Sequence, residues 1–316
     1  MSEPRPFRFS LQAVEAESRR EWVDLVKRVD DAGFDMLVTA DHIGGCLSPL
    51  LPLATAAEVS DRLRLGVMVL NNDFHPPSLL ARDVATLDLL SEGRVELGLG
   101  AGHAQPEYER AGIKFDRARV RVGRLEEAVV VLRRLLDGET VRFSGDHYQL
   151  VNERCDPPPV QSHVPLLVGG GGRRVLGLAA RHADAVGFTG LGRTLADGQR
   201  HDPAGFRADQ VDEDVAAVRL TAGDRLAATE LELQVLVQAV VVSDDPAGQA
   251  AEIARTRLPS LSAEDVLATP YLMVGTTDGL VERLLAQRDR WGFSHYTVRA
   301  DALGQIEPII AALAGR

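Results

Sequence analysis

Short apolar runs alternate with amphipathic segments along most of the 316 residues, and this alternation most constrains the fold. Each apolar run has the length of a buried strand, and each is followed by a segment with helical spacing. Strands separated by helices require a parallel sheet, because every return crossing places a helix on the face of the sheet. We expect eight strands, at residues 7–13, 35–40, 64–70, 94–99, 165–168, 184–188, 231–242 and 294–299.

Eight such units in a chain of this length predict a (β/α)8 TIM barrel, with an open doubly wound sheet as the alternative. Three stretches exceed the minimal repeat, at 138–164, 190–210 and 243–271, and we interpret them as insertions after strands 4, 6 and 7. The second has the composition of a mobile loop, and the third is expected to contain extra helix. Because no low-complexity linker interrupts the pattern, residues 1–316 are expected to form a single domain.

The charge balance and the cysteines exclude several classes of protein. Lys plus Arg is 35 and Asp plus Glu is 46, a net charge of −11 that argues against nucleic acid or an anionic membrane as the main partner. The two cysteines, Cys46 and Cys155, belong to no Cys/His cluster, so we expect neither a disulfide framework nor a metal site. No window approaches the length of a membrane span. These features favour a cytoplasmic protein that acts on a small molecule.

A glycine loop follows the expected strand at 165–168. Four glycines, Gly169–Gly172, lead directly into a helical segment that begins with Arg173 and Arg174. The helix starts without a Ser, Thr, Asp or Asn cap, so its first amides lack an obvious acceptor. Bare amides, glycines that permit close approach and two cations favour a bound phosphate. The alternative is an ordinary barrel turn whose arginines point into water.

Candidate catalytic residues are sought where the strands end, because a parallel barrel places its active site there. His42 follows Asp41 at the end of the second strand and is a candidate acid, base or hydrogen-bond donor. A polar histidine on the rim is the alternative. His103 ends the fourth strand and is a weaker candidate. The other histidines are interpreted as surface or helix-end residues: His75, His147, His163, His182, His201 and His295.

The run Gly98–His103 resembles the opening of a dinucleotide-binding fingerprint, but His103 replaces the third glycine and no ribose-binding carboxylate completes the motif. We expect these glycines to keep the barrel mouth open so that a flat ligand can approach the backbone. The sequence contains no Walker, His-Glu-x-x-His or Gly-x-Ser-x-Gly motif. Covalent serine catalysis and metal-dependent hydrolysis therefore have no specific support.

Several of these motifs together resemble the bacterial luciferase-like superfamily. The resemblance covers about residues 7 to 300, is weakest in 190–270, and is closer to the actinobacterial F420-dependent oxidoreductases than to true luciferases. The motifs that carry it are Thr39–His42, Leu70–Pro76, Leu87–Arg94, Gly98–Gly102, Gly169–Gly172, Leu178–Asp184 and Val274–Thr276.

The resemblance implies a barrel that binds a flavin or the deazaflavin coenzyme F420. The ring would lie against a backbone bulge at Met68-Val69, often with a non-prolyl cis peptide, and His42 would lie near its reacting edge. The phosphate would lie on Gly169–Arg174, and His103 would face the substrate. The implied cofactor-binding residues are Asp41, His42, Met68, Val69, Gly100, Ala101, Gly102, Gly169, Gly170, Gly171, Gly172 and Arg173.

We therefore expect an F420-dependent oxidoreductase that moves a hydride to or from a small organic substrate, with His42 as the catalytic residue. One alternative is an FMN-dependent monooxygenase that uses reduced flavin and oxygen. A second is a barrel that binds the cofactor without turnover. Relatives that oxidise sugar phosphates carry an acid where this chain has His103, so their substrate is not carried over. A homodimer is expected from the resemblance and from base rates.

Overall fold

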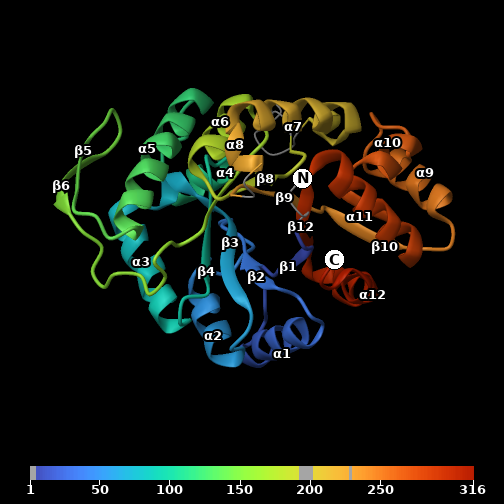
Figure 1. The fold of residues 1–316 in the computed structure, drawn as a ribbon, viewed down its shortest axis with the longest axis horizontal. Coiled ribbons are helices and arrows are strands. Elements are labelled where there is room, and N and C mark those ends of the chain that lie inside the picture. Colours follow the sequence, from blue (N-terminus) through green and yellow to red (C-terminus); the bar gives the residue numbers. More distant parts are fainter. Residues whose placement is uncertain (1–4, 192–201, 228–229) are drawn as a thin grey trace.

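The computed structural model describes residues 5–191, 202–227 and 230–316. Its centre is a closed barrel of parallel strands in the order β1-β12-β9-β8-β7-β4-β3-β2 (Figure 1). This confirms the predicted TIM barrel, and each of the eight predicted strands contributes to it. The barrel strands are β1 (Arg8–Gln12), β2 (Met36–Thr39), β3 (Arg64–Asn71), β4 (Val95–Gly100), β7 (Leu166–Gly169), β8 (Ala185–Phe188), β9 (Glu232–Leu236) and β12 (Phe293–Arg299).

Helices surround the barrel and bury one face each against it (Figure 1). In α5, for example, Leu125, Val129 and Leu132 are fully buried, as the helical spacing of these residues requires. The helices between barrel strands, and the one that follows the last strand, are α1 (Arg19–Asp31), α2 (Leu51–Val59), α3 (Pro77–Leu90), α5 (Ala118–Leu136), α6 (Arg173–His182), α7 (Ala208–Ala222), α11 (Thr277–Trp291) and α12 (Leu303–Leu313).

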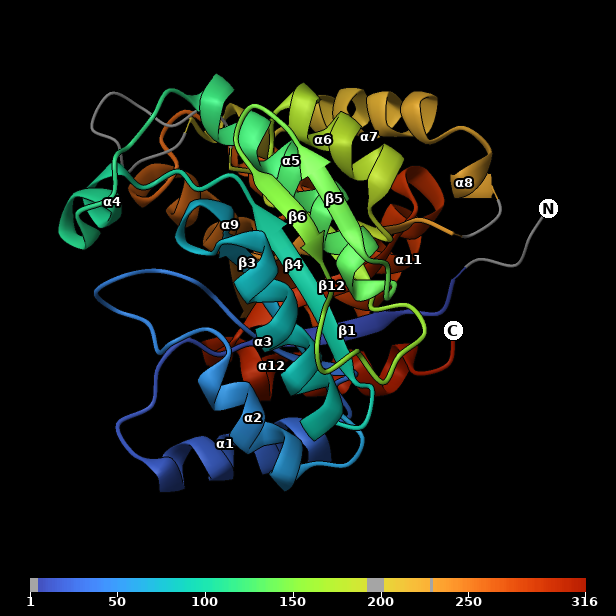
Figure 2. The same cartoon turned by 90° about the vertical axis from the view of Figure 1, so that its left-hand side faces the viewer.

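Between β4 and α5 the chain contains an additional helix, α4 (Gln105–Ala111), which the sequence analysis did not predict. After α5 the chain forms an antiparallel hairpin of β5 (Val141–Ser144) and β6 (Gln149–Glu153), which lies along α5 (Figure 2). The sequence predicted an excursion here but no strands. After β8, residues 192–201 of the loop expected at 190–210 lie outside the described residues, and the rest includes a 3-10 turn at Pro203–Phe206 and the start of α7.

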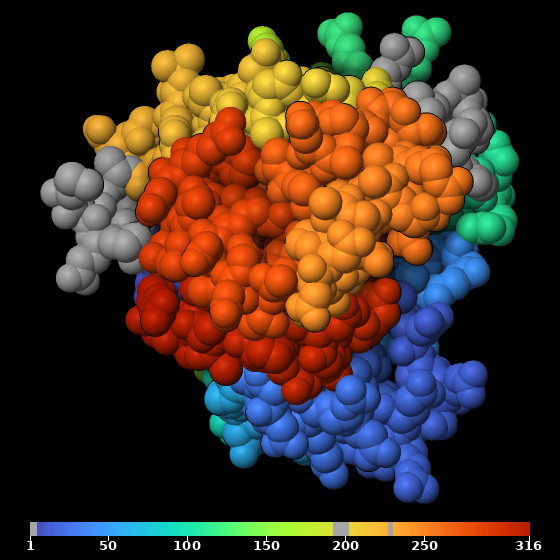
Figure 3. All heavy atoms as spheres, turned by 90° about the vertical axis from the view of Figure 1, so that its right-hand side faces the viewer, coloured from blue at the N-terminus to red at the C-terminus, as the bar shows by residue number. Residues whose placement is uncertain are grey.

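The insertion after β9 contains the expected extra helix, in α9 (Pro246–Thr256) and α10 (Ala263–Ala268). The predicted strand at 231–242 is in fact two strands, because the chain leaves the barrel after Leu236. Its second half, β10 (Ala239–Val242), pairs in parallel with β11 (Leu272–Gly275) outside the barrel. The C-terminal segments from α9 onward form one continuous face, orange to red in Figure 3.

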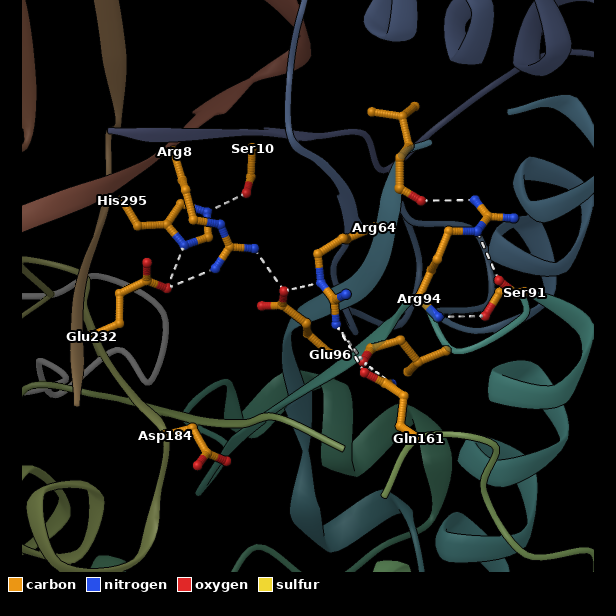
Figure 4. A network of polar contacts seen from close by, with 12 residues as sticks. Arg8, Ser10, Arg64, Ser91, Arg94, Glu96, Gln161, Asp184, Glu232 and His295 are labelled. Carbon is orange, nitrogen blue, oxygen red and sulfur yellow. Dashed lines mark hydrogen bonds and ion pairs between the residues drawn. The ribbon is translucent and has the colours of Figure 1, made fainter. Parts of the chain in front are cut away.

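A network of buried polar side chains fills part of the barrel interior (Figure 4). Ser10 Oγ lies 2.5 Å from His295 Nε2, and His295 Nδ1 lies 3.0 Å from Glu232 Oε2. Arg8 donates to both Glu232 and Glu96. The interpretation of His295 as a surface or helix-end residue is wrong, since it lies on the inward-facing register of β12 and is 1% exposed.

A small apolar cluster adjoins the C-terminal end of the barrel. It consists of Met36, Val38, Met68 and Leu236, with Val69 packed against it. In the described part of the chain both cysteines are free, and no group of His, Cys, Asp or Glu side chains is arranged to hold a metal ion. The helices within the described ranges are all too short or too polar to cross a membrane.

Candidate active site

A cavity of about 960 Å³ opens at the C-terminal ends of the barrel strands. Met68 and Leu236 of the apolar cluster are in its lining. Every predicted site residue except Arg173 contributes to this lining. The predicted residues that line it are Asp41, His42, Met68, Val69, Gly100, Ala101, Gly102, His103, Gly169, Gly170, Gly171 and Gly172.

The N-terminus of α6 has the uncapped form that the sequence predicts. Gly172 is its N-cap residue and, within the described residues, no side chain caps the first turn. A Cβ added to Gly172 would meet no described atom within 4 Å, so the described part of the chain leaves space beside these amides. Gly170 has a φ of +153°, a conformation that only glycine adopts readily.

The two arginines of this first turn point away from the cavity. The side chain of Arg173 is 85% exposed and lies 4.0 Å from Glu213 of α7. Arg174 forms a bidentate ion pair with Glu126 of α5. The side chain of Arg173 is therefore not part of the cavity lining, because the first turn of α6 directs it toward α7. Three arginines that the sequence analysis did not single out do line the cavity: Arg117, Arg121 and Arg299.

The expected backbone bulge occurs in β3. The pairing of β3 with β4 shifts register between Val67 and Leu70, and the Met68-Val69 peptide is cis. A Cβ on Gly100 would lie 2.7 Å from Val69 Cγ2, and one on Gly169 would lie 3.0 Å from Val69 Cγ1. These glycines therefore make room for the bulge itself, rather than only for a flat ligand as the sequence analysis expected.

Asp41 connects the end of β2 to the segment that follows β3. Its Oδ2 accepts hydrogen bonds from the backbone amide of Asn71 at 2.9 Å and from His75 Nε2 at 2.8 Å. His75 does stand next to a helix start, as predicted, but its ring is partly buried and holds Asp41. These hydrogen bonds join the motifs Thr39–His42 and Leu70–Pro76 at the mouth of the barrel.

His42 is paired with an acid from α4. Its Nδ1 lies 2.8 Å from Glu107 Oε1, and Glu107 Oε2 also accepts a weaker hydrogen bond from the backbone amide of Ile43 at 3.4 Å. An ionised carboxylate only accepts, so Nδ1 carries the proton and Nε2 is the nitrogen that can exchange a proton with a ligand. The ring of His103 stands edge-on to His42 at 5.6 Å between centroids.

Glu107 lines the cavity and bonds His42, and the sequence analysis missed it. It lies on α4, 65 residues from His42, and only the fold brings the two together. The available signal was an acid in the first turn of the helix that follows Gly98–His103.

Two arginines form opposite parts of the cavity wall. Arg121 is 7% exposed, stacks 4.0 Å above the ring of Phe115 and donates to the carbonyl of Gly102 at 3.3 Å. Arg299, at the end of β12, donates to the side-chain oxygens of Gln12 and Gln238. The cavity thus has cationic groups near the β4 loop and near the end of β12.

This fold and cavity define a (β/α)8 barrel with a ligand site at the C-terminal ends of its strands, built on a bulged third strand and an uncapped glycine loop. A model of the luciferase-like monooxygenase family matches residues 5–295. The chain belongs to that family.

The chain is also similar to individual members. It is 32% identical over 173 residues to an F420-dependent glucose-6-phosphate dehydrogenase of Amycolatopsis mediterranei, 52% of each chain. It is 30% identical over 181 residues to a 5,10-methylenetetrahydromethanopterin reductase of Archaeoglobus fulgidus, 57% of this chain and 52% of that protein. The matched segments thus span about half the length of these curated relatives. An F420-dependent secondary alcohol dehydrogenase in complex with an F420-acetone adduct superposes with a TM-score of 0.75 at 18% identity, covering 98% of both chains.

Proposed function

We propose that this protein is an F420-dependent oxidoreductase that transfers a hydride between the deazaflavin and a small organic substrate. The observation that carries the proposal is that one cavity joins the Met68-Val69 bulge, His42 and the uncapped N-terminus of α6. Relatives that resemble this chain in sequence and relatives that resemble it in fold are F420-dependent enzymes. Those relatives differ in substrate, so membership of the family leaves the substrate open.

The residues of the cavity fit a long, flat, anionic cofactor. The volume is at the upper end of the range for small-molecule sites. The bulge presents Met68 and Val69 as an apolar surface for a ring, and the first amides of α6 offer donors for a phosphate. In this proposal the backbone amide of Arg173 contributes directly, whereas its side chain lies outside the cavity near Glu213. When bound, F420 would supply the hydride chemistry.

The chain itself supplies orientation and proton handling. Glu107 holds His42 by Nδ1, which leaves Nε2 to give or take the proton that accompanies hydride transfer at a substrate oxygen. Asp41, braced by His75, holds the adjoining backbone in place. His103 lies beside His42 and is proposed to face the substrate.

We further propose a cytoplasmic, single-domain protein that assembles as a homodimer. Large apolar side chains are exposed on the adjacent helices α2 and α3, which supports an interface there. They are Leu51, Leu79, Leu89 and Leu90. Light scattering should give the mass of two chains for the wild type and of one chain for Leu79→Glu/Leu90→Glu, and a monomeric wild type would contradict this assembly.

The activity is tested by incubating the F420-loaded protein with a panel of small alcohols and monitoring the loss of the visible absorbance of F420. We expect at least one alcohol to bleach the bound cofactor in the wild type but not in His42→Ala. The variant should still bind F420, because His42 is one of many lining residues. Oxygen consumption with reduced FMN and no bleaching of F420 would instead support the monooxygenase alternative.

A further inference from the structure

Arg299 has an unusual set of partners for an arginine in a cavity wall. Its Nη1 donates to Gln12 Oε1 at 3.2 Å, and its Nη2 donates to Gln238 Oε1 at 2.6 Å. Both acceptors are neutral amide oxygens. Within residues 5–191, 202–227 and 230–316, no carboxylate forms an ion pair with Arg299.

Two other arginines of this protein show how pairing with carboxylates changes the pKa of a guanidinium. Burial lowers the pKa of a guanidinium, but Arg8 and Arg124 each bond two carboxylates, which outweigh burial and raise the pKa. For Arg299 burial is the larger effect and its pKa is lowered, with the charge of Asp301 only partly offsetting it. A half-buried cation that lacks a counter-charge costs free energy, which an anionic ligand would recover.

The guanidinium is also held in a fixed position. Gln12 Nε2 donates to the carbonyl of Met68 at 2.7 Å, and Gln238 Nε2 donates to the carbonyl of Thr189 at 3.2 Å. The two glutamines therefore orient Arg299 from both sides without neutralising it. A guanidinium has about five N–H donors, more than these two bonds use, so donors remain for a ligand.

Arg299 lies across the cavity from the glycine loops. In the closed barrel β12 has β1 and β9 as neighbours, and β4 is the strand diametrically opposite. The proposed cofactor contacts at Gly100–Gly102 and Gly169–Gly172 belong to β4, β7 and the loops after them. The cation is thus on the side that faces the cofactor, where a second reactant would bind.

We propose that Arg299 binds the anionic group of the substrate, and that this substrate is a small organic carboxylate. This inference rests on the proposed oxidoreductase function, for which it names the substrate class. A single guanidinium matches a monoanion and can bind a carboxylate in a bidentate manner. A phosphate dianion carries one negative charge more than the single charge of Arg299 can balance.

The test is a calorimetric titration with benzoate, its neutral isostere benzamide and phenyl phosphate, on protein saturated with F420. We expect benzoate to bind the wild type at least about tenfold more tightly than benzamide. Two neutral variants, Arg299→Met and Arg299→Gln, should lose this preference, while Arg299→Lys should keep part of it. Arg82→Met, which removes an exposed charge on α3 outside the cavity lining, should leave it unchanged.

Equal binding of benzoate and benzamide to the wild type, or no binding of either, would overturn the proposal even if a variant failed to fold. Tighter binding of phenyl phosphate than of benzoate would overturn the carboxylate assignment. Retention of the benzoate preference in the neutral variants would show that a group other than Arg299 binds the carboxylate. The titrations are repeated without F420, so that the anion site is tested independently of the cofactor. Failure of the protein to bind F420 would then refute the proposed cofactor only.

Discussion

For individual side chains, exposure to the cavity distinguishes those that can contact a ligand from those that only support the fold. Ser10, His295 and Glu232 are linked in the order of a nucleophile, base and acid, yet all three are buried and none lines the described cavity. His42 and Glu107 form a comparable pair, but His42 is 44% exposed in that cavity. The second pair is therefore the one that a ligand in the cavity can reach, which is why the proposed function assigns the proton to it.

Replacing Glu107 should disturb the proton-handling role of His42. In Glu107→Leu, Nδ1 loses its acceptor, so nitrogen NMR of labelled histidine should show a mixed tautomer in place of a single Nδ1-protonated form. Turnover, measured as kcat/KM, should fall by about tenfold or more. Glu109→Leu, on the same helix but exposed, is the matched control. An unchanged tautomer in Glu107→Leu would show that Glu107 does not position His42.

At the scale of elements, the bulge in β3 and the glycines of β4 and β7 depend on each other. Val69 occupies space that a side chain at Gly100 or Gly169 would need. The strand that carries the bulge and the strands that carry the glycine loops are therefore matched in shape. The loss of stability caused by a larger residue at one of these glycines should therefore be offset by a smaller residue in the β3 bulge.

Gly100→Ala should destabilise the fold by about 1–3 kcal/mol, the usual cost of overpacking. Val69→Ala removes the atom that the new Cβ meets, so the double variant should recover much of the loss in a chemical-denaturation cycle. Gly304→Ala in α12, where a Cβ meets nothing within 4 Å, should instead be neutral or slightly stabilising. Additive effects of the Gly100 and Val69 changes would contradict this account of the glycines.

In the whole molecule, the barrel closes by pairing its first and last strands. β1 pairs with β12 along its full length, and the backbone amide of Phe7 donates to the carbonyl of Arg316 at 2.9 Å. Glu232 belongs to this closure, because it bonds Arg8 on β1 and His295 on β12. Burial alone would raise the pKa of Glu232, but His295, Arg8 and Arg5 outweigh it and lower the pKa to about 2.

The lowered pKa predicts acid sensitivity. Because the usual value is 4.5, ionised Glu232 stabilises the fold above that pH, and this contribution of about 3 kcal/mol is lost as the pH falls from 4.5 toward 2. Glu232→Gln should lower the free energy of unfolding at neutral pH and show a weaker decline across this window. Glu230→Gln, an exposed neighbour, should follow the wild type. Parallel curves for the wild type and Glu232→Gln would refute the assignment.

The sequence predicted the eight barrel strands and the glycine loops and strand-end residues of the cavity lining, because strand length, helical spacing and glycine position are local signals. It did not predict the β5–β6 hairpin, whose strands are largely exposed and so lack an apolar run, or the departure of β10 from the barrel. His295 was misinterpreted because an inward-facing polar residue in a strand looks like an exposed one. Glu107 and Arg299 were missed because their partners are distant in sequence and only tertiary contacts reveal them.

The most direct test of the central claim is a titration of the purified protein with F420 and, in parallel, with FMN. The proposed function predicts that F420 binds at least about tenfold more tightly than FMN. Binding is measured by the change in cofactor fluorescence. Tighter binding of FMN, or no binding of F420, would contradict the account.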